Sequence, residues 1–326
     1  QRQAYDTLLG ATHTPWAPWT IVPANSKTHR NLMIATLLRE HPAAMARLQA
    51  IGLSGHMHGA TLLDGADHVL RPCILWNDGR SGPQCAALTA RADFHGIAGN
   101  LVMAGFTAPK LLWVAQNEPE IFARTAKVLL PKDYLRLWLT GEHVAEMSDA
   151  AGTLWLDVGK RDWSDALLAA TGLTRAQMPR LVEGSEVSGH LRAELAERWG
   201  IPRVPVAGGG GDNAATACGM GVMTPGTGFL SLGTSGVLFA ATEAYAPNTG
   251  DAVHTFCHAV PDTWHQMGVI LSATDSMSWL SEITGKPVPE LAGLVGAVTA
   301  PSPVLFLPYL SGERTPLNDP DATGAF

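Results

Sequence analysis

A loop of four small residues joins two apolar runs and has the composition of a phosphate-binding site. The runs are Phe229–Leu232 and Val237–Ala240, and the loop is Gly233-Thr234-Ser235-Gly236. Glycines permit positive φ and a close approach of the backbone, so successive N–H groups and two hydroxyls could form a concave site for phosphate oxygens. The GK[ST] ending and the following helix of a P-loop are absent. An ordinary hairpin turn is the alternative interpretation.

Asp212 is a second candidate, because it directly follows four glycines, residues 208–211. A carboxylate at the mouth of a glycine-lined cleft can take a proton from a hydroxyl while that oxygen attacks phosphorus. The alternative is a helix N-cap, in which the Asp212 side chain accepts backbone N–H bonds. Both roles can hold at once. Four glycines are costly to order, which favours a place where something approaches the backbone closely.

Two histidines and a polar loop form the third candidate cluster. If residues 51–58 are extended, His56 and His58 share a face and make half of a metal site of the kind found in barrel metallohydrolases, although the later ligands show no matching pattern. The polar loop supplies donors and acceptors for a polyhydroxylated ligand, with Trp76 as an apolar floor. It consists of Trp76, Asn77, Asp78, Gly79 and Arg80. A polar loop that satisfies its own groups is the alternative.

Strand and helix signals alternate in the elements that must position these residues, which predicts an α/β fold. The predicted elements are a buried strand at 51–55, an apolar strand at 69–76, helices at 83–91 and 109–126, a strand at 128–130 before a helix from 132, a helix capped by Ser164 through 170, a capping box at Thr174–Gln177, and a helix capped by Ser26 through 38. The composition then shifts to glycine, and we place a domain boundary near residue 204.

The composition favours an acidic enzyme with a large core. The 326 residues suit about two domains, and 16% charged residues is low enough to bury much of the chain. A net charge of −7 argues against a nucleic-acid surface, and no apolar run is long enough for a bilayer. Four cysteines without a CxxC pair indicate neither a zinc knuckle nor a disulfide framework. We therefore expect a cytoplasmic protein, and Gln1 and Phe326 read as the edges of an excerpt.

One thirteen-residue phrase resembles the first signature of the FGGY carbohydrate kinases at every defined position. The phrase is Gly105-x-Thr107-x-x-Lys110-Leu111-x-Trp113-Val114-x-Gln116-Asn117. Further phrases are similar to that family in the same order, namely Gly52–Ala60, Leu75–Arg80, Leu130–Arg136, Asp149–Thr153, Gly209–Asn213, Ser231–Gly236 and Leu310–Pro316. The resemblance runs from about His41 to the end of the sequence.

The resemblance implies two actin-like, ribonuclease-H-like domains with a cleft between them. The expected division is a first domain at 41–204 that lacks its first strands and their Asp-x-Gly-Thr phosphate loop, and a second, truncated domain at 205–326. Residues 1–39 instead resemble the C-terminal end of a family 2 polyphosphate kinase, in the phrases Ala11–Ala24 and Lys27–Asn31. We expect this tail to occupy 1–40, with a join near 39–42, and both domains to be incomplete.

The resemblance also implies an activity: transfer of the ATP γ-phosphate, with Mg²⁺, to the 5-hydroxyl of D-xylulose. Asp212 is then the proton acceptor, and the phosphate loop consists of Gly233, Thr234 and Ser235. The residues expected to hold the ketose are Met57, His58, Trp76, Asn77, Asp78 and Asn213. No residue is assigned to a metal. His56 stands where the family more often has Gln.

Three functional hypotheses therefore remain open. The first is the kinase, impaired in this chain because one phosphate loop and much of the nucleotide pocket are missing. The second is a noncatalytic sugar-binding fragment or chimera, and the third is the His-x-His metallohydrolase. The expected partners of the kinase are the ketose and ATP, without nucleic acid or membrane, and a homodimer stays open.

Overall fold

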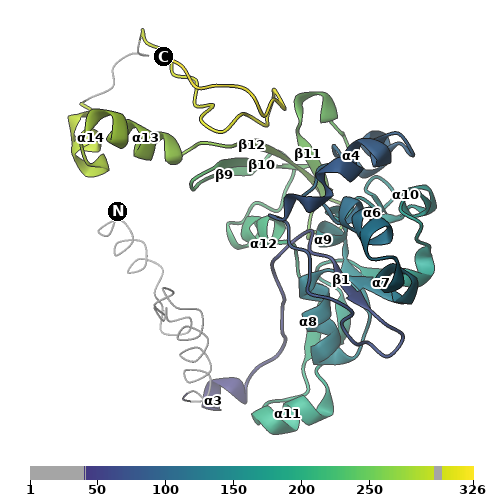
Figure 1. Ribbon diagram of the computed structural model, residues 1–326. Coiled ribbons are helices and arrows are strands. Elements are labelled where there is room, and N and C mark those ends of the chain that lie inside the picture. The colour runs from purple at the N-terminus through teal and green to yellow at the C-terminus, as the bar shows by residue number, and fades with distance from the viewer. Residues whose placement is uncertain (1–39, 41, 297–302) are drawn as a thin grey trace. The chain divides into compact units, whose positions relative to one another are not determined.

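The computed structural model describes residue 40 and residues 42–296 and 303–326, in two units (Figure 1). One unit comprises 1–49 and 193–204, and its described residues include helices α3 (Pro42–Met45) and α11 (Ala193–Trp199). The other unit comprises 50–192 and 205–326 and contains every element discussed below. The helix predicted after Ser26 and the segment that resembles a polyphosphate kinase lie outside the described residues.

Short strands and helices alternate over the first part of the larger unit. The helices are α4 (Gly82–Thr89), α5 (Phe94–Ala98), α6 (Thr107–Asn117), α7 (Pro119–Arg124), α8 (Pro131–Thr140), α9 (Met147–Ala151) and α10 (Asp165–Ala170), with 3-10 turns η1 (Gly79–Ser81) and η2 (Arg175–Gln177). The strands are β1 (Thr61–Leu63), β2 (Lys127–Leu129), β3 (Val144–Glu146), β4 (Leu156–Asp157), β5 (Asp162–Trp163), β6 (Arg180–Val182), β7 (Val187–His190) and β8 (Pro205–Ala207). They pair as β1-β2, β3-β6, β4-β5 and β7-β8, and only β3-β6 is parallel.

The local helix signals are largely confirmed. Ser164 accepts a bond from the N–H of Leu167 and caps α10, and both halves of the Thr174–Gln177 capping box are formed. The single helix predicted at 109–126 is wrong in one respect, since it divides into α6 and α7. Pro119 begins α7, and a residue before proline avoids helical geometry, as Glu118 does at φ −133° and ψ 57°.

The two strands predicted before α4, at 51–55 and 69–76, do not form as regular strands. Residues 51–54 make only isolated parallel bridges, Ile51 to Val206 and Ser54 to Gly210, and Ser54 is exposed. Among the described residues, the backbone hydrogen bonds of this segment go to residues 205–210, so only one of its two edges is paired. The apolar segment 69–76 makes single bridges, because Pro72 cannot donate to a ladder.

A four-stranded antiparallel sheet forms the second part of the larger unit (Figure 1). Its order is β11-β12-β10-β9, with β9 (Gly228–Leu232), β10 (Gly236–Thr242), β11 (His254–Cys257) and β12 (Trp264–Ile270). The predicted hairpin is confirmed, because β9 and β10 pair from Leu232 opposite Gly236. Helix α12 (Asp212–Gly219) precedes the sheet, the turn η3 (Thr249–Asp251) lies between β10 and β11, and α13 (Asp275–Thr284) and α14 (Val288–Leu294) follow.

One hydrophobic core joins the helical part to this sheet. Leu111 of α6 and Trp155 belong to the same buried cluster as Ala217 of α12 and Phe239 of β10. On the other face of the hairpin, the opposed Leu230 and Leu238 are each 59% exposed. No helix in the described ranges combines the length and the apolarity needed to span a bilayer.

Candidate active site

The segment around Met57 and His58 is a turn with unusual backbone geometry. Gly55, His56 and His58 have φ of 128°, 43° and 69°. Non-glycine residues with positive φ are uncommon and cluster at functional sites. His56 is exposed, whereas the side chain of Met57 is buried.

This turn contradicts the premise of the metallohydrolase hypothesis. That hypothesis needed His56 and His58 on one face of an extended strand, but the left-handed turn breaks the alternation of side chains. Within the described part of the chain, no group of three or more His, Cys, Asp and Glu residues is arranged to hold a metal ion. The expected shared face is therefore wrong.

The His58 ring is enclosed and hydrogen-bonded from one side. Its Nδ1 lies 2.7 Å from the carbonyl of Gly152, and its ring packs edge-on against Phe106 at 4.6 Å between centroids. Burial lowers the pKa of His58 to about 4, against the opposing effect of the Gly152 bond, and the charges of Lys110 and Arg314 lower it further. The ring is neutral at pH 7. Because a carbonyl only accepts, Nδ1 carries the proton and Nε2 is left as an acceptor.

Lys110 joins the His58 turn to the neighbouring chain. Its fully buried ammonium donates to the carbonyls of His58 and Gly105, each at 2.7 Å, and the Thr107 hydroxyl also donates to His58 at 3.2 Å. Burial lowers the pKa of Lys110 to about 8. A Cβ on Gly105 would lie 3.1 Å from the carbonyl oxygen of Trp76, so this segment also abuts the polar loop.

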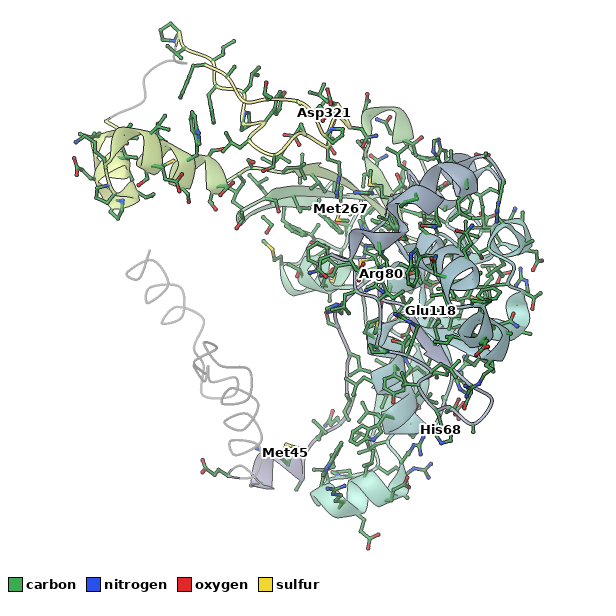
Figure 2. All side chains as sticks on the ribbon, in the orientation of Figure 1. Met45, His68, Arg80, Glu118, Met267 and Asp321 are labelled. Carbon is green, nitrogen blue, oxygen red and sulfur yellow. The ribbon has the colours of Figure 1, made fainter. Side chains whose placement is uncertain are left out.

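Part of the polar loop is exposed to solvent, and part of it is hydrogen-bonded within the loop. Trp76 is 59% exposed and Asn77 is exposed, so both can meet a ligand. Asp78 accepts from the backbone N–H of Arg80 at 3.1 Å and from its Nε at 2.9 Å, and the Arg80 bond holds the pKa of Asp78 below its ordinary value. The Arg80 guanidinium, labelled in Figure 2, lies 5.0 Å from the centre of the Trp113 ring.

Asp212 is the first residue of α12, and its side chain is exposed. The predicted N-cap role is wrong, because Gly211 holds the cap position. Among the described residues, the Asp212 carboxylate accepts hydrogen bonds only from its neighbour Asn213, at 2.8 Å from the backbone N–H and 3.3 Å from the side-chain amide. A Cβ on Gly211 would lie 3.2 Å from the Met57 sulfur. The fold thus brings the Met57 turn against the residue that precedes Asp212.

The glycine run serves the close packing of the chain against itself. A Cβ on Gly209 would lie 2.0 Å from the carbonyl oxygen of Leu53, and one on Gly208 would lie 2.2 Å from that of Glu183. A cavity of about 480 Å³ borders the run and is lined by Leu53, Ser54 and Gly210, among others. Ala259 also lines it, so the cavity lies between segments of both predicted domains.

The Gly-Thr-Ser loop bonds to the start of α13. The hydroxyl of Thr274 donates to the carbonyl of Gly233 at 2.7 Å, and the N–H of Ala273 donates to that of Thr234 at 2.7 Å. The N–H of Gly233 bonds inside the loop to Ser235 at 2.9 Å, so it is not free for a phosphate. Thr234 and Ser235 are exposed. Within the described part of the chain, the hydrogen bonds of this loop do not reach Met57, His58 or Asp212.

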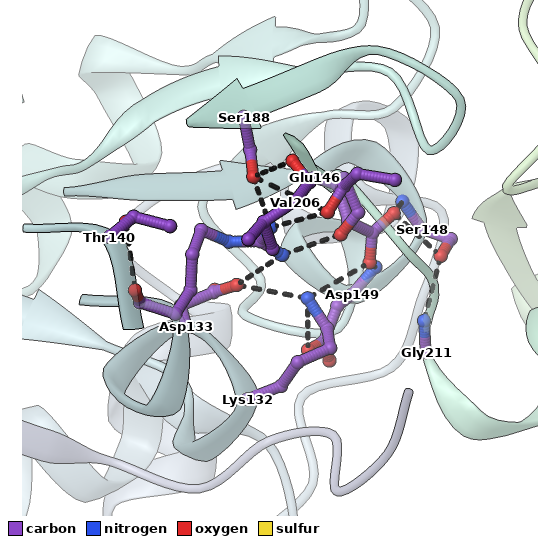
Figure 3. A network of polar contacts seen from close by, with 12 residues as sticks. Lys132, Asp133, Thr140, Glu146, Ser148, Asp149, Ser188, Val206 and Gly211 are labelled. Atoms are coloured by element: carbon purple, nitrogen blue, oxygen red, sulfur yellow. Dashed lines mark hydrogen bonds and ion pairs between the residues drawn. The ribbon is translucent and has the colours of Figure 1, made fainter. Parts of the chain in front are cut away.

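The sequence did not predict a buried ion cluster that contacts the backbone just before α12 (Figure 3). It consists of Lys132, Asp133, Arg136, Glu146 and Asp149, each at most 4% exposed. Lys132 Nζ lies 2.9 Å from Asp133, 3.4 Å from Glu146 and 3.4 Å from Asp149. The available signal was the presence of charged residues among apolar ones, at Lys132, Asp133 and Arg136 of the predicted helix and at Glu146 and Asp149.

Two family models match the chain. The N-terminal domain of the FGGY family of carbohydrate kinases matches residues 25–219, and its C-terminal domain matches 228–326. The chain is 57% identical over 282 residues to the xylulose kinase of Escherichia coli (strain K12) and 54% identical over 286 residues to that of Klebsiella pneumoniae. These matches cover 86% and 87% of this chain but 58% and 59% of the two relatives, so the chain spans about three fifths of their length.

Solved structures confirm the predicted fold class of two actin-like domains. A xyloylose kinase from Brucella ovis matches with a TM-score of 0.87 and 61% identity, over 90% of this chain and 61% of that one. The xylulose kinase from Rhodospirillum rubrum matches with a TM-score of 0.78 and 28% identity, over 90% of this chain and 63% of that one.

Proposed function

The chain belongs to the FGGY family of carbohydrate kinases, and on that premise we propose that it takes part in the ATP-dependent phosphorylation of D-xylulose to D-xylulose 5-phosphate. The observation that carries this proposal is the packing of the Met57 turn against Gly211, immediately before Asp212. A sugar held by Met57 and His58 would lie beside an exposed carboxylate.

In the proposed reaction, the 5-hydroxyl oxygen of the ketose forms a bond to the γ-phosphorus of ATP. The bond from that phosphorus to the bridging oxygen breaks, ADP leaves, and the hydroxyl proton passes to the Asp212 carboxylate. Neutral His58 offers Nε2 as an acceptor for a sugar hydroxyl, and Trp76, Asn77, Asp78 and Asn213 complete the proposed sugar contacts. Positioning supplies much of the rate in such transfers.

The nucleotide is assigned to the second part of the larger unit. We propose that the exposed hydroxyls of Thr234 and Ser235 contact its phosphates, with Gly233, which has no side chain, leaving room for their approach. Mg²⁺ is usually bound by substrate phosphates and only one or two carboxylates, and the exposed Asp212 is a donor of that class. When bound, Mg²⁺ would neutralise charge on the phosphates.

The division of the chain remains part of the proposal. We assign a first domain to 41–204 and a second to 205–326, with 1–40 as a separate tail, and we propose a cytoplasmic enzyme that uses ATP and a ketose. A homodimer is one arrangement that size measurement would test.

A coupled ADP-release assay with D-xylulose, ATP and Mg²⁺ tests the function. We expect sugar-dependent turnover that falls at least 10²-fold in Asp212→Asn, in line with the usual contribution of a general base, about 10² to 10⁴. Asp321→Asn, a change at an exposed carboxylate, is the matched control and should keep full activity. Turnover no higher than that of Asp212→Asn would refute the kinase, and calorimetric ketose binding without ATP binding would then support the noncatalytic sugar-binding alternative.

A further inference from the structure

The hydroxyl of Ser148 reaches across the fold to the start of α12. Gly211, 63 residues later in the chain, donates its backbone N–H to Ser148 Oγ at 2.9 Å (Figure 3). Gly211 is the N-cap of α12, and Asp212 is the first residue of that helix. The Ser148 hydroxyl therefore accepts the backbone N–H of the residue that directly precedes the proposed base.

The direction of this hydroxyl is set by a buried carboxylate. Ser148 donates its own proton to Glu146 Oε2 at 2.8 Å, which leaves a lone pair for Gly211. Glu146 also accepts the backbone N–H groups of Ser148 and Asp149, at 2.8 and 2.9 Å. Lys132 Nζ, 3.4 Å from Oε1, compensates the buried charge. The orientation of the Ser148 hydroxyl is thus fixed by the Glu146 carboxylate, which is itself held by further hydrogen bonds.

The same ion cluster holds the other end of the glycine run. Arg136, which is fully buried, donates to the carbonyl of Ala207 at 2.7 Å and to that of Gly208. Four consecutive glycines have little conformational stiffness of their own. The run at 208–211 is instead fixed by Arg136 where it begins and by Ser148 where it ends.

We infer that Ser148 is a positioning residue for Asp212: through Gly211, it fixes the first turn of α12 and so the place of the carboxylate. This inference rests on the proposed function. A displacement of about 1 Å at a reacting group can cost on the order of 10²-fold in rate. Removal of the hydroxyl should therefore lower kcat more than it raises KM for the sugar, because the Met57 and His58 contacts keep their own supports.

Two measurements on Ser148→Ala test the inference, with Thr171→Val as the matched control. Thr171 is 2% exposed, and its hydroxyl accepts from Trp155 Nε1 at 3.0 Å and donates to the carbonyl of Leu168 at 2.9 Å, so its loss also removes buried hydrogen bonds, but away from α12. The first measurement is amide hydrogen exchange over residues 207–216. We expect exchange at Gly211 at least tenfold faster in Ser148→Ala and unchanged in Thr171→Val.

The second measurement is steady-state kinetics with D-xylulose and ATP. We expect kcat to fall about tenfold or more in Ser148→Ala with KM changed less than twofold, and both to stay near wild type in Thr171→Val. Unchanged exchange at Gly211 in Ser148→Ala would show that Ser148 does not hold the Gly211 backbone, whether or not the wild-type protein phosphorylates D-xylulose. Faster exchange with an unchanged kcat in an active wild type would overturn the positioning role. An inactive wild type would refute the proposed function, while the exchange result would still decide the anchor.

Discussion

Lys110 donates a hydrogen bond of 2.7 Å from its buried ammonium to the backbone carbonyl of His58. A second bond of the same length goes to Gly105, which abuts the backbone of Trp76. One cation thus joins the two segments assigned to the sugar. A buried charge is tolerated only where polar groups compensate it, and here the compensating groups are the carbonyl of His58, in the proposed site, and that of Gly105, next to it.

Lys110→Met should destabilise the protein by about 2 kcal/mol, because two buried carbonyls lose a charged donor. Thr107 would retain one bond to His58, so we expect the fold to survive. Urea denaturation measures the change. Lys160→Met is the control, since the Lys160 side chain is 82% exposed and an exposed ion pair contributes little to stability. Equal losses in both variants would contradict the structural role of Lys110.

His58 makes folding sensitive to mild acid. Burial lowers its pKa from 6.5 to about 4, so between these values the unfolded chain binds more protons than the folded one. The contribution of His58 is fully present above about pH 6.5 and is lost as the pH falls towards 4. The difference in unfolding free energy between wild type and His58→Gln should therefore shrink over that range. A pH-independent difference would show that the ring is not held neutral by burial.

Asp149 should give stability the opposite dependence on pH from His58. Burial raises its pKa well above 3.8, and Lys132 only partly opposes that rise, so the folded protein retains a proton that the unfolded chain loses. The burial of Asp149 therefore lowers the free energy of unfolding progressively as the pH rises above about 4.

Asp149→Asn should therefore gain stability relative to wild type as the pH rises above about 4, which denaturation at three pH values would measure. Asp133→Asn is the control, because it removes the 2.9 Å partner of Lys132 and should cost about 3 kcal/mol at pH 7. A constant difference between Asp149→Asn and wild type would mean that Asp149 is ionised in the fold.

Gly209→Ala should cost more than about 2 kcal/mol, because the residue has φ +79° and the new Cβ would lie 2.0 Å from the carbonyl oxygen of Leu53. Gly219→Ala, at the end of α12, has nothing within 4 Å and should change stability by less than about 1 kcal/mol. Thermal unfolding of the two variants measures the contrast, and similar midpoints would contradict the close approach at Gly209.

The local elements were predictable because their signals lie within a few residues. Ser164 and the Thr174–Gln177 pair cap their helices by contacts three residues apart, and the β9–β10 hairpin needs only two apolar runs and a short loop. The cap at Asp212 was predicted wrongly for the same reason: aspartate is a good local cap, but Gly211 occupies that position, and its N–H bonds to a distant serine.

By itself, the sequence determined the family, the hairpin, most helix ends and the residues with the right chemistry. Only the tertiary structure decided that His58 turns inward to Gly152, that the Met57 turn meets Gly211, and that Ser148 anchors the helix of Asp212. The partners in these contacts are separated by 63 residues or more, or meet through backbone carbonyls and glycines that carry no side-chain signal. Local propensity cannot specify such contacts, because they form only when the segments are packed around one core.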